Sequence, residues 1–171
     1  MTVGKEVEQM ERTLDRLLVW VQAADAKGTI ALAIATAMLG VLASACPEAE
    51  RWSGATGGEA AFCGIVASLA AVGLLGSGLC VCLSTIPRTT GPRGSLVFFG
   101  GIVEVERAMF HKAVLARSED NYLEDLCNQC HRNAEIASEK FKYVRLATVL
   151  LMASIIPWLL ALFAMYRLGV R

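Results

Sequence analysis

The sequence predicts an all-α, multipass membrane protein in which three transmembrane helices are continuous with a helical bundle outside the membrane. Three stretches contain no charged residue, at 29–46, 60–87 and 146–166. A helix that crosses a bilayer needs about 17–25 predominantly apolar residues, so each stretch is long enough. The composition agrees, because 55% of the 171 residues are hydrophobic and the mean hydropathy is +0.50.

These stretches organise residues 1–171 as a single membrane domain. Its expected parts are a helix at 5–27, a first span at 28–46, a second span at 60–86, a segment of loop and helices at 87–143, and a third span at 145–167. No helix breaker separates the first helix from the first span, so we expect one continuous helix from about residue 5 to Ala45. Pro157 lies inside the third span, where neighbouring helices can compensate for the lost hydrogen bond.

The distribution of Lys and Arg predicts the orientation. With three spans, the N-terminus and the 87–143 segment share one side of the membrane, and the 47–59 loop and the C-terminus occupy the other. Only three of the 16 basic residues, Arg51, Arg167 and Arg171, fall on the second side. Because cytoplasmic segments are enriched in Lys and Arg, we expect the N-terminus and the 87–143 segment to be cytoplasmic.

The helix at 5–27 is amphipathic. Its apolar residues recur in alternating steps of three and four: Val7, Met10, Leu14, Leu17, Val21 and Ala24. This narrow seam is suited to packing against a partner helix, either within the chain's own bundle or in self-association.

Two further helices are expected before the third span. The first runs from about Ile102 to Ala116. Ser118 is the predicted N-cap of the last helix, which begins at about Glu119 and continues into the third span. The predicted apolar seam of that helix is Leu123, Cys127, Cys130, Ala134, Ala137 and Phe141.

The stretch CNQCH, Cys127 to His131, has the spacing of a c-type haem attachment site. It can also be part of a metal site or simply hold two thiols packed on the apolar seam. Covalent haem attachment in bacteria occurs in the periplasm, whereas the expected side here is the reducing cytoplasm, which also disfavours a disulfide. A zinc site needs a fourth ligand, and His111 is the only other His. We expect packed thiols and no metal or other cofactor.

Charged and aromatic residues gather where the chain enters the membrane. The basic ones are Lys27, Arg88, Arg93, Lys140, Lys142 and Arg145. They can set the topology and contact anionic headgroups, or they can form an anion site. Asp25 needs a charged partner so close to the apolar span, and Lys142 or Arg145 is expected at the same depth. It is either half of a structural ion pair or a ligand-binding residue. Phe98 and Phe99 can anchor the loop or offer a face on which a base stacks.

Small residues form rows along the first two spans. The rows are Thr36–Gly40–Ser44, Gly64–Ser68 and Gly73–Ser77. Such rows let helices approach closely in lipid, either within one protomer or between protomers, and a homo-oligomer is expected. The chain has no P-loop, no Gly-rich dinucleotide fingerprint and no convincing nucleophile–base pair, so we expect no catalytic residues and no enzymatic activity.

Four short motifs, in this order and spacing, carry a family resemblance. They are ADAKG (Ala24–Gly28), PR (Pro87–Arg88), LVFFG (Leu96–Gly100) and KY (Lys142–Tyr143). With them the chain resembles the transmembrane effector family of Pycsar antiphage systems, although CNQCH has no counterpart in that pattern. The resemblance implies an antiviral effector of the bacterial inner membrane. It also implies a partner pyrimidine nucleotide cyclase, whose product, cyclic CMP or cyclic UMP, activates the effector. Impairment of the membrane then causes abortive infection.

A cyclic mononucleotide presents one phosphate and one flat base. On the premise of the resemblance, Lys27, Arg88 and Lys142 are the candidate phosphate ligands, Phe99 the surface for the base, and Asp25 the acceptor for a sugar or base donor. The alternative function is a non-catalytic structural or regulatory membrane subunit that acts through a protein partner. The seams and small-residue rows fit that alternative equally well.

Overall fold

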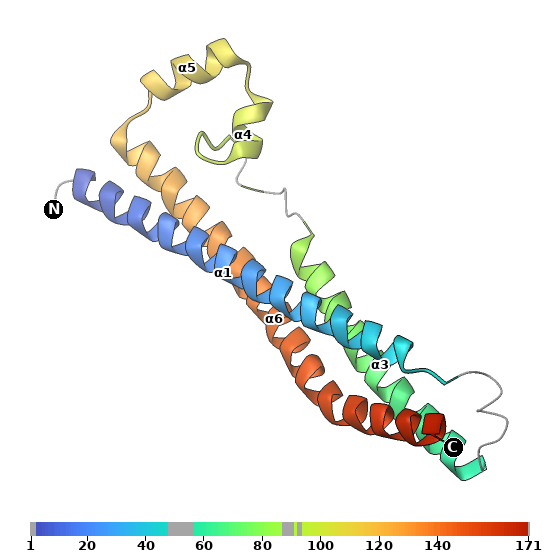
Figure 1. Ribbon diagram of the computed structural model, residues 1–171. Coiled ribbons are helices and arrows are strands. Elements are labelled where there is room, and N and C mark those ends of the chain that lie inside the picture. The colour runs from blue at the N-terminus through green and yellow to red at the C-terminus, as the bar shows by residue number, and fades with distance from the viewer. Residues whose placement is uncertain (1–2, 48–56, 87–90, 92–93, 171) are drawn as a thin grey trace. The chain divides into compact units, whose positions relative to one another are not determined.

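The chain folds into helices of very different lengths. Figure 1 shows the computed structural model, which describes residues 3–47, 57–86, 91 and 94–170. The elements are α1 (Val3–Ser44), α3 (Gly57–Thr85), α4 (Phe99–Glu104), α5 (Arg107–Leu115) and α6 (Glu119–Val170). The described residues contain no strand, so the all-α prediction is confirmed.

Three of these helices, α1, α3 and α6, are long and apolar enough to cross a membrane. α1 has 42 residues and is unbroken, as predicted for the chain from about residue 5 to Ala45. α6 has 52 residues and contains Pro157 without ending there. A helix rises about 1.5 Å per residue, so α1 and α6 are each about twice as long as one membrane crossing requires.

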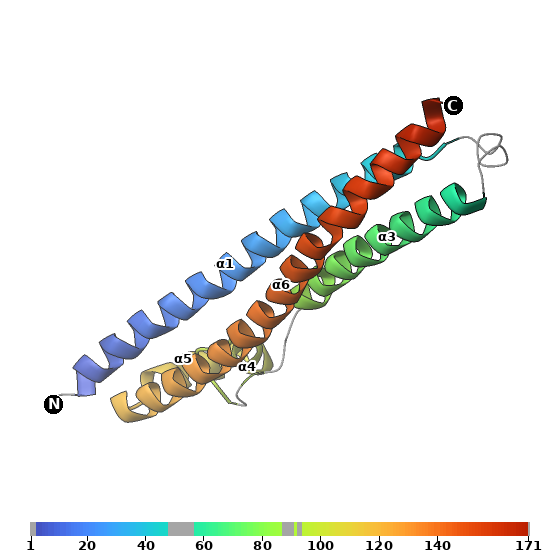
Figure 2. The same cartoon turned by 90° about the horizontal axis from the view of Figure 1, so that it is seen from below.

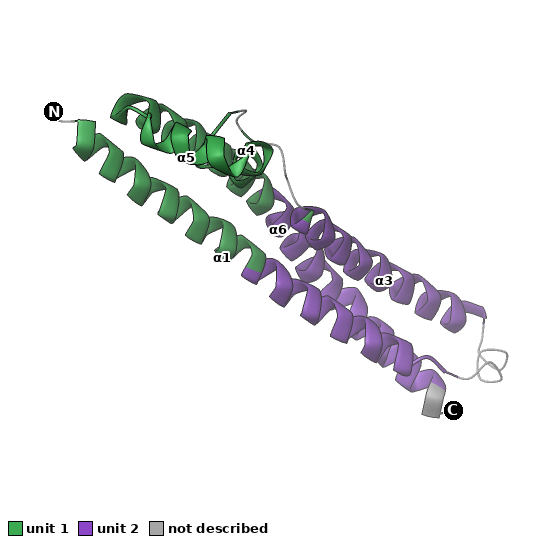
Figure 3. Cartoon of the chain, turned by 90° about the horizontal axis from the view of Figure 1, so that it is seen from above, with its two compact units in different colours: residues 1–25, 86–141 green, residues 26–85, 142–171 purple. Residues whose placement is uncertain are grey.

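The chain divides into two compact units (Figure 3). Unit 1 comprises residues 1–25 and 86–141, and unit 2 comprises residues 26–85 and 142–171. Unit 2 therefore contains all of α3 and the uncharged stretches of α1 and α6. Unit 1 contains the remaining, polar segments of α1 and α6 together with α4 and α5.

In unit 2, segments of α1, α3 and α6 run side by side (Figures 1 and 2). Two clusters of buried apolar side chains join the three helices, one around Leu74 and Leu151 and one around Ala70 and Met165. Hydroxyl and indole groups add hydrogen bonds between helices. The Oγ of Ser77 donates to the carbonyl oxygen of Ala147 at 2.8 Å. The Nε1 of Trp158 donates to that of Met38 at 2.9 Å.

The small residues of α3 bring it close to α6. A Cβ built on Gly73 would collide with the Oγ of Ser154, and one on Gly76 would lie 3.3 Å from Leu150. Gly40 on α1 and Gly64 on α3 have nothing within 4 Å of such a Cβ. Within one chain, therefore, the Gly73–Ser77 row packs tightly, and Gly40 and Gly64 do not.

The outward surface of unit 2 is apolar. Large exposed side chains occur on every one of its helices, for example Ile30, Leu69, Val72, Ile156 and Leu159. A soluble bundle would place polar residues at these positions. An apolar exterior around a core of packed helices is what a lipid-facing bundle requires.

In unit 1, the first half of α1 packs along the first part of α6 (Figures 1 and 2). The predicted seam of α1 is confirmed, because its Leu17 and Ala24 are buried and its other four members are half-buried. The predicted seam of α6 is wrong in part. Cys130 and Ala137 are buried as expected, and Leu123 is half-buried. Cys127, Ala134 and Phe141 are exposed. The buried face is instead completed by Leu126 and the polar Asp125 and Asn133.

The prediction of one helix from about Ile102 to Ala116 is also wrong, because the chain forms two short helices there. α4 ends at Glu104 and α5 begins at Arg107. Between them Val105 has an extended backbone, with φ −102° and ψ 134°, and Glu106, with φ −57° and ψ 140°, is also outside the helical region. Neither Gly nor Pro marks the break, and β-branched Val tolerates the extended conformation well.

The start of α6 follows its prediction. The Oγ of Ser118 accepts a hydrogen bond from the backbone N–H of Asn121 at 3.3 Å. The acidic Glu119 and Asp120 occupy the first turn. Ser118 therefore satisfies one of the free N–H groups at the helix start, and the two carboxylates complement the helix dipole.

Candidate functional site

Asp25 is half of an ion pair in unit 1. Its Oδ1 lies 2.5 Å from the Nζ of Lys140, whose side chain is only 14% exposed, whereas that of Asp25 is 42% exposed. The expected partners were Lys142 or Arg145, and the structure gives Lys140 instead. Lys140 lies on the buried side of α6, in line with Asn133 and Ala137, so its ammonium is the one that needs a neutralising carboxylate. The pair favours the structural interpretation of Asp25.

Lys27 and Lys142, two of the candidate phosphate ligands, belong to unit 2 and are both exposed. Gly28, which follows Lys27, has a packing role. A Cβ there would lie 3.4 Å from the Cγ1 of Val81 and 3.7 Å from the Cγ2 of Val144. Because Gly28 has no side chain, α1 can approach α3 and α6 closely at this point, and the neighbouring Lys27 is exposed.

The LVFFG motif separates two aromatic rings by their exposure. Phe98 is 8% exposed and Phe99 is 60% exposed, and their centroids are 4.6 Å apart. The Phe98 ring lies so close to Gly91 and Gly100 that a side chain at either glycine would collide with it. The ring of Phe98 therefore fills the interior of this segment, and the ring of Phe99 remains accessible to a ligand.

Ser95 shapes the turn that leads into α4. Its Oγ accepts hydrogen bonds from the backbone N–H groups of Val97 at 3.1 Å and Phe98 at 2.9 Å. A Cβ on Gly101 would collide with the carbonyl oxygen of Ser95. The side chain of Ser95 thus satisfies two N–H groups ahead of α4, as a short Ser motif often does, and holds Phe98 and Phe99 in place.

A buried ion pair, which the sequence analysis missed, ties this turn to α6. An Nη2 of Arg117 lies 2.6 Å from the Oδ2 of Asp125, and the two side chains are 14% and 9% exposed. The same Oδ2 accepts the backbone N–H of Leu96 at 2.9 Å. Asp125 therefore holds the start of LVFFG and the Arg117 guanidinium with one carboxylate.

The network continues to α1. The guanidinium of Arg117 lies 5.0 Å from the ring centroid of Tyr122, and the hydroxyl of Tyr122 donates to the Oε1 of Glu11 at 2.8 Å. Burial, and then the bond to Glu11, raise the pKa of Tyr122 above its ordinary value. The phenol consequently stays protonated near neutral pH and keeps its role as a donor to Glu11.

The CNQCH stretch packs its two thiols differently. Cys130 is buried, with its Sγ 3.5 Å from the carbonyl oxygen of Met10, and burial raises the pKa of this thiol. Cys127 is exposed, although its Sγ lies 3.4 Å from the Sδ of Met10.

The third member, His131, is highly exposed and lies 3.4 Å from Glu135. A hydrogen bond from Arg132 is the main cause that lowers the pKa of Glu135. In the part of the chain that the structure describes, no three His, Cys, Asp or Glu side chains form a group suited to a metal ion. The packing of Cys130 against Met10 favours the interpretation of packed thiols.

The candidate nucleotide residues are thus distributed over the chain. Asp25 and Phe99 belong to unit 1, and Lys27 and Lys142 belong to unit 2. Arg88 lies outside the described residues. Of these, the structure assigns a partner in a salt bridge to Asp25 and an exposed position to Phe99 and Lys142.

One comparison with known proteins bears on these residues. A family model described as a Pycsar effector protein domain matches residues 9–167 of the chain. The match includes all four motifs on which the resemblance rested. No curated protein and no solved structure matches the chain.

Proposed function

The chain belongs to the Pycsar effector family, and from that premise we propose that it is the membrane-impairing effector of an antiphage system switched on by a cyclic pyrimidine mononucleotide. The nucleotide, cyclic CMP or cyclic UMP, is made by a partner cyclase after infection. The effector then impairs the inner membrane, and the cell dies before phage matures. The family match over residues 9–167 is the observation that carries this proposal.

The chain acts on the membrane without catalysing a reaction. Binding of the nucleotide favours one packing of the helices over another, in proportion to its difference in affinity for the two. Moving such an equilibrium from 1:99 to 99:1 requires about a 10⁴-fold difference in affinity. A single charge-assisted contact supplies too little, since a hydrogen bond to a charged group contributes about 1.5–3 kcal/mol. Several contacts to the phosphate and base are therefore needed.

Exposed cations and an exposed ring support this proposal. Lys142 is exposed, and so is Phe99, whereas the neighbouring Phe98 is buried. Lys and Arg are the usual phosphate partners, and an exposed ring offers a face for a base. The N-terminus is proposed to be cytoplasmic, where the cyclase releases its product, and the active form is proposed to be a homo-oligomer.

The direct test is binding of cyclic CMP and cyclic UMP to the purified, detergent-solubilised chain, with the oligomer size measured before and after. We expect one of the two nucleotides to bind and the Lys142→Ala and Arg88→Ala variants to lose the response while still inserting into the membrane. Lys112→Ala, an exposed lysine of α5, is the matched control.

A cellular test separates the proposal from its alternative. Expression of the chain should become toxic only alongside a nucleotide cyclase that makes cyclic CMP or cyclic UMP. Toxicity that is independent of the cyclase would favour a membrane subunit acting through a protein partner. Unchanged killing by both the Lys142 and Arg88 variants would reject the proposed nucleotide residues.

A further inference from the structure

Three sulfur atoms from two helices come together in unit 1, and we call Met10, Cys127 and Cys130 the sulfur cluster. Met10 lies on α1, whereas Cys127 and Cys130 lie three residues apart on α6, where side chains at this spacing are neighbours. The Sγ of Cys127 lies 3.4 Å from the Sδ of Met10. The Sγ of Cys130 lies 3.5 Å from the carbonyl oxygen of Met10. Both thiols of α6 therefore contact the same residue of α1.

The sulfur cluster is a set of soft metal ligands. Thiolate and thioether sulfur favour soft ions such as Cu(I), whereas magnesium and calcium prefer oxygen. Among the residues that the structure describes, no His, Asp or Glu joins the two thiols to make a group of three. His131, the nearest His along the chain, is highly exposed and lies beside Glu135. A structural zinc ion takes four ligands, so three sulfur atoms leave its coordination incomplete.

The exposure of the three residues suits a site that an ion can enter. Cys127 is exposed, Met10 is half-buried and Cys130 is only 7% exposed. An ion can therefore meet the thiol of Cys127 first and then reach the shielded sulfur of Cys130. Met has three rotatable side-chain bonds, so its sulfur can move to admit an ion without a shift of the α1 backbone.

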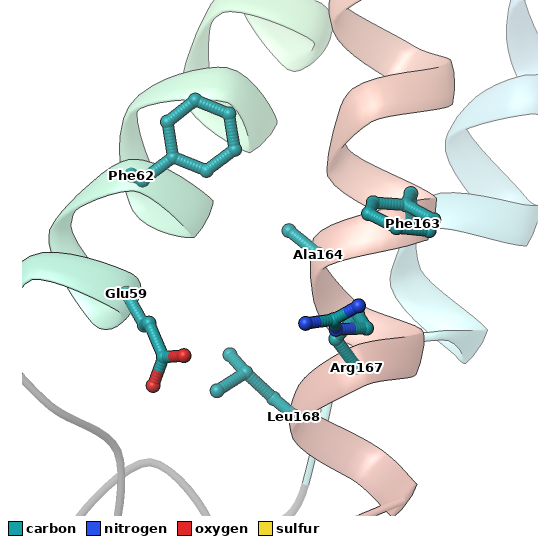
Figure 4. A pocket seen from close by; sticks show the side chains of 6 residues that line it. All are labelled: Glu59, Phe62, Phe163, Ala164, Arg167 and Leu168. Carbon is teal, nitrogen blue, oxygen red and sulfur yellow. The ribbon is translucent and has the colours of Figure 1, made fainter.

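The cavity of unit 2 offers no comparable set of ligands. It has a volume of about 230 Å³ and lies between the start of α3 and the end of α6 (Figure 4). Its lining residues, which contain no sulfur, are Glu59, Phe62, Phe163, Ala164, Arg167 and Leu168. The positive charge of Arg167 also opposes the binding of a cation. A soft metal ion therefore finds its ligands in the sulfur cluster and not in this cavity.

We propose that the sulfur cluster binds one Cu(I) ion through the two thiolates of Cys127 and Cys130 and the thioether of Met10. Each thiol releases its proton to solvent as its sulfur binds the ion, because the thiolate is the ligand form. Burial raises the pKa of Cys130, so the ion displaces a proton that this thiol otherwise keeps at neutral pH. The expected cytoplasmic side keeps both thiols reduced. The bound ion links α1 to α6 within unit 1.

The test is competition for Cu(I) between the full chain in detergent and the chromophoric chelator bicinchoninate, under anaerobic, reducing conditions. We expect one tightly bound ion per chain. Cys127→Ser should weaken binding by at least about 100-fold, because even the loss of an outer-shell partner of a metal ligand costs about 10–100-fold. Met10→Leu, which conserves side-chain volume, should weaken it by about tenfold.

Two variants elsewhere in the chain are the matched controls. Cys46→Ser removes an exposed thiol of unit 2, and Met109→Leu removes an exposed thioether of α5. Both should bind Cu(I) as tightly as the unmodified chain. A second measurement needs no variant, because X-ray absorption at the copper edge identifies the ligands directly. In the loaded, unmodified chain it should show three sulfur neighbours.

Absence of tight binding by the unmodified chain would overturn the proposal, and so would equal affinities of the unmodified and Cys127→Ser chains. An unchanged affinity of Met10→Leu, or nitrogen or oxygen among the copper ligands, would also count against this set of ligands. Displacement of Cu(I) by an equimolar amount of zinc would reject the choice of ion. Neither measurement uses a cyclic nucleotide or a cyclase, so this proposal and the proposed function can each fail without the other.

Discussion

Arg117 and Asp125 form a salt bridge of 2.6 Å between two side chains that are almost fully buried. Asp125 also accepts the N–H of Leu96, and Arg117 also donates to the carbonyl oxygen of Asn121 at 3.0 Å. A buried pair whose remaining groups are hydrogen-bonded is expensive to break from one side, because the surviving charge stays buried without a counter-ion.

We therefore expect Arg117→Ala to lower the free energy of unfolding by about 3 kcal/mol. Asp125→Ala should cost at least as much, because it also leaves the N–H of Leu96 without its acceptor. Thermal unfolding in detergent, followed by far-UV circular dichroism, measures both. The matched control is Arg12→Ala, whose ion pair with Glu8 is exposed and contributes little. Equal small effects at Arg117 and Arg12 would show that the buried pair is not stabilising.

Substitutions of Phe98 and Phe99 should have different effects, one on stability and the other on the response to ligand. Phe98→Ala removes a buried ring from between two glycines and is expected to destabilise the protein by about 3–5 kcal/mol. Phe99→Ala removes an exposed ring and should leave stability within about 0.5 kcal/mol. If Phe99 stacks on the base, its variant should lose the response to cyclic nucleotide at unchanged stability. Unfolding curves and nucleotide binding on the same preparations decide this.

Gly73 should be intolerant of even one methyl group. Gly73→Ala places a Cβ against the Oγ of Ser154 and is expected to cost about 1–3 kcal/mol through overpacking between α3 and α6. Gly64→Ala, on the same helix with nothing within 4 Å, should have almost no effect. Unfolding in mixed detergent micelles compares the two variants. The double variant Gly73→Ala/Ser154→Ala should recover part of the loss, and no recovery would mean that the close approach lies elsewhere.

The two thiols of CNQCH should differ in reactivity. Only the thiolate reacts with an alkylating reagent. Burial raises the pKa of Cys130, so a smaller fraction of this thiol is ionised at pH 8 than of a thiol with the ordinary pKa. We expect Cys127 to be alkylated first and Cys130 to follow slowly. The difference between their alkylation rates should become smaller as the pH rises. Peptide mass spectrometry over time reads both sites. In denaturant they should react alike, and faster labelling of Cys130 in the folded protein would contradict its burial.

The spacing of apolar residues correctly predicted the buried face of a helix where the buried residues are themselves apolar. The seam of α1 was predicted correctly because its inward residues are all apolar, from Val7 to Ala24. The seam of α6 was displaced because part of its buried face is polar. Asn133 is buried with its Nδ2 donating to the carbonyl oxygen of Gln129 at 2.9 Å, and Asp125 is buried against Arg117. Polar residues satisfied in this way look like surface residues in a sequence.

The sequence alone did not predict the helix break at Val105 or which charged residues form ion pairs. The break at Val105 has no Gly or Pro to signal it, so a continuous helix was the reasonable expectation. The Arg117–Asp125 pair depends on how the α5–α6 connection turns, which spacing along the chain does not reveal. For Asp25, the sequence indicated that a cation was required, and the structure identified Lys140. The expected depth in the membrane had pointed to Lys142 or Arg145, because depth alone does not show which side of α6 faces Asp25.

The unbroken course of α1 and α6 has a mechanical consequence. Each is one continuous helix with residues in both units, and neither has a glycine or proline at residues 25–26 or 141–142, where one unit gives way to the other along the chain. Because the backbone hydrogen bonds of a helix form cooperatively, unwinding either helix locally at these residues would break bonds on both sides of them.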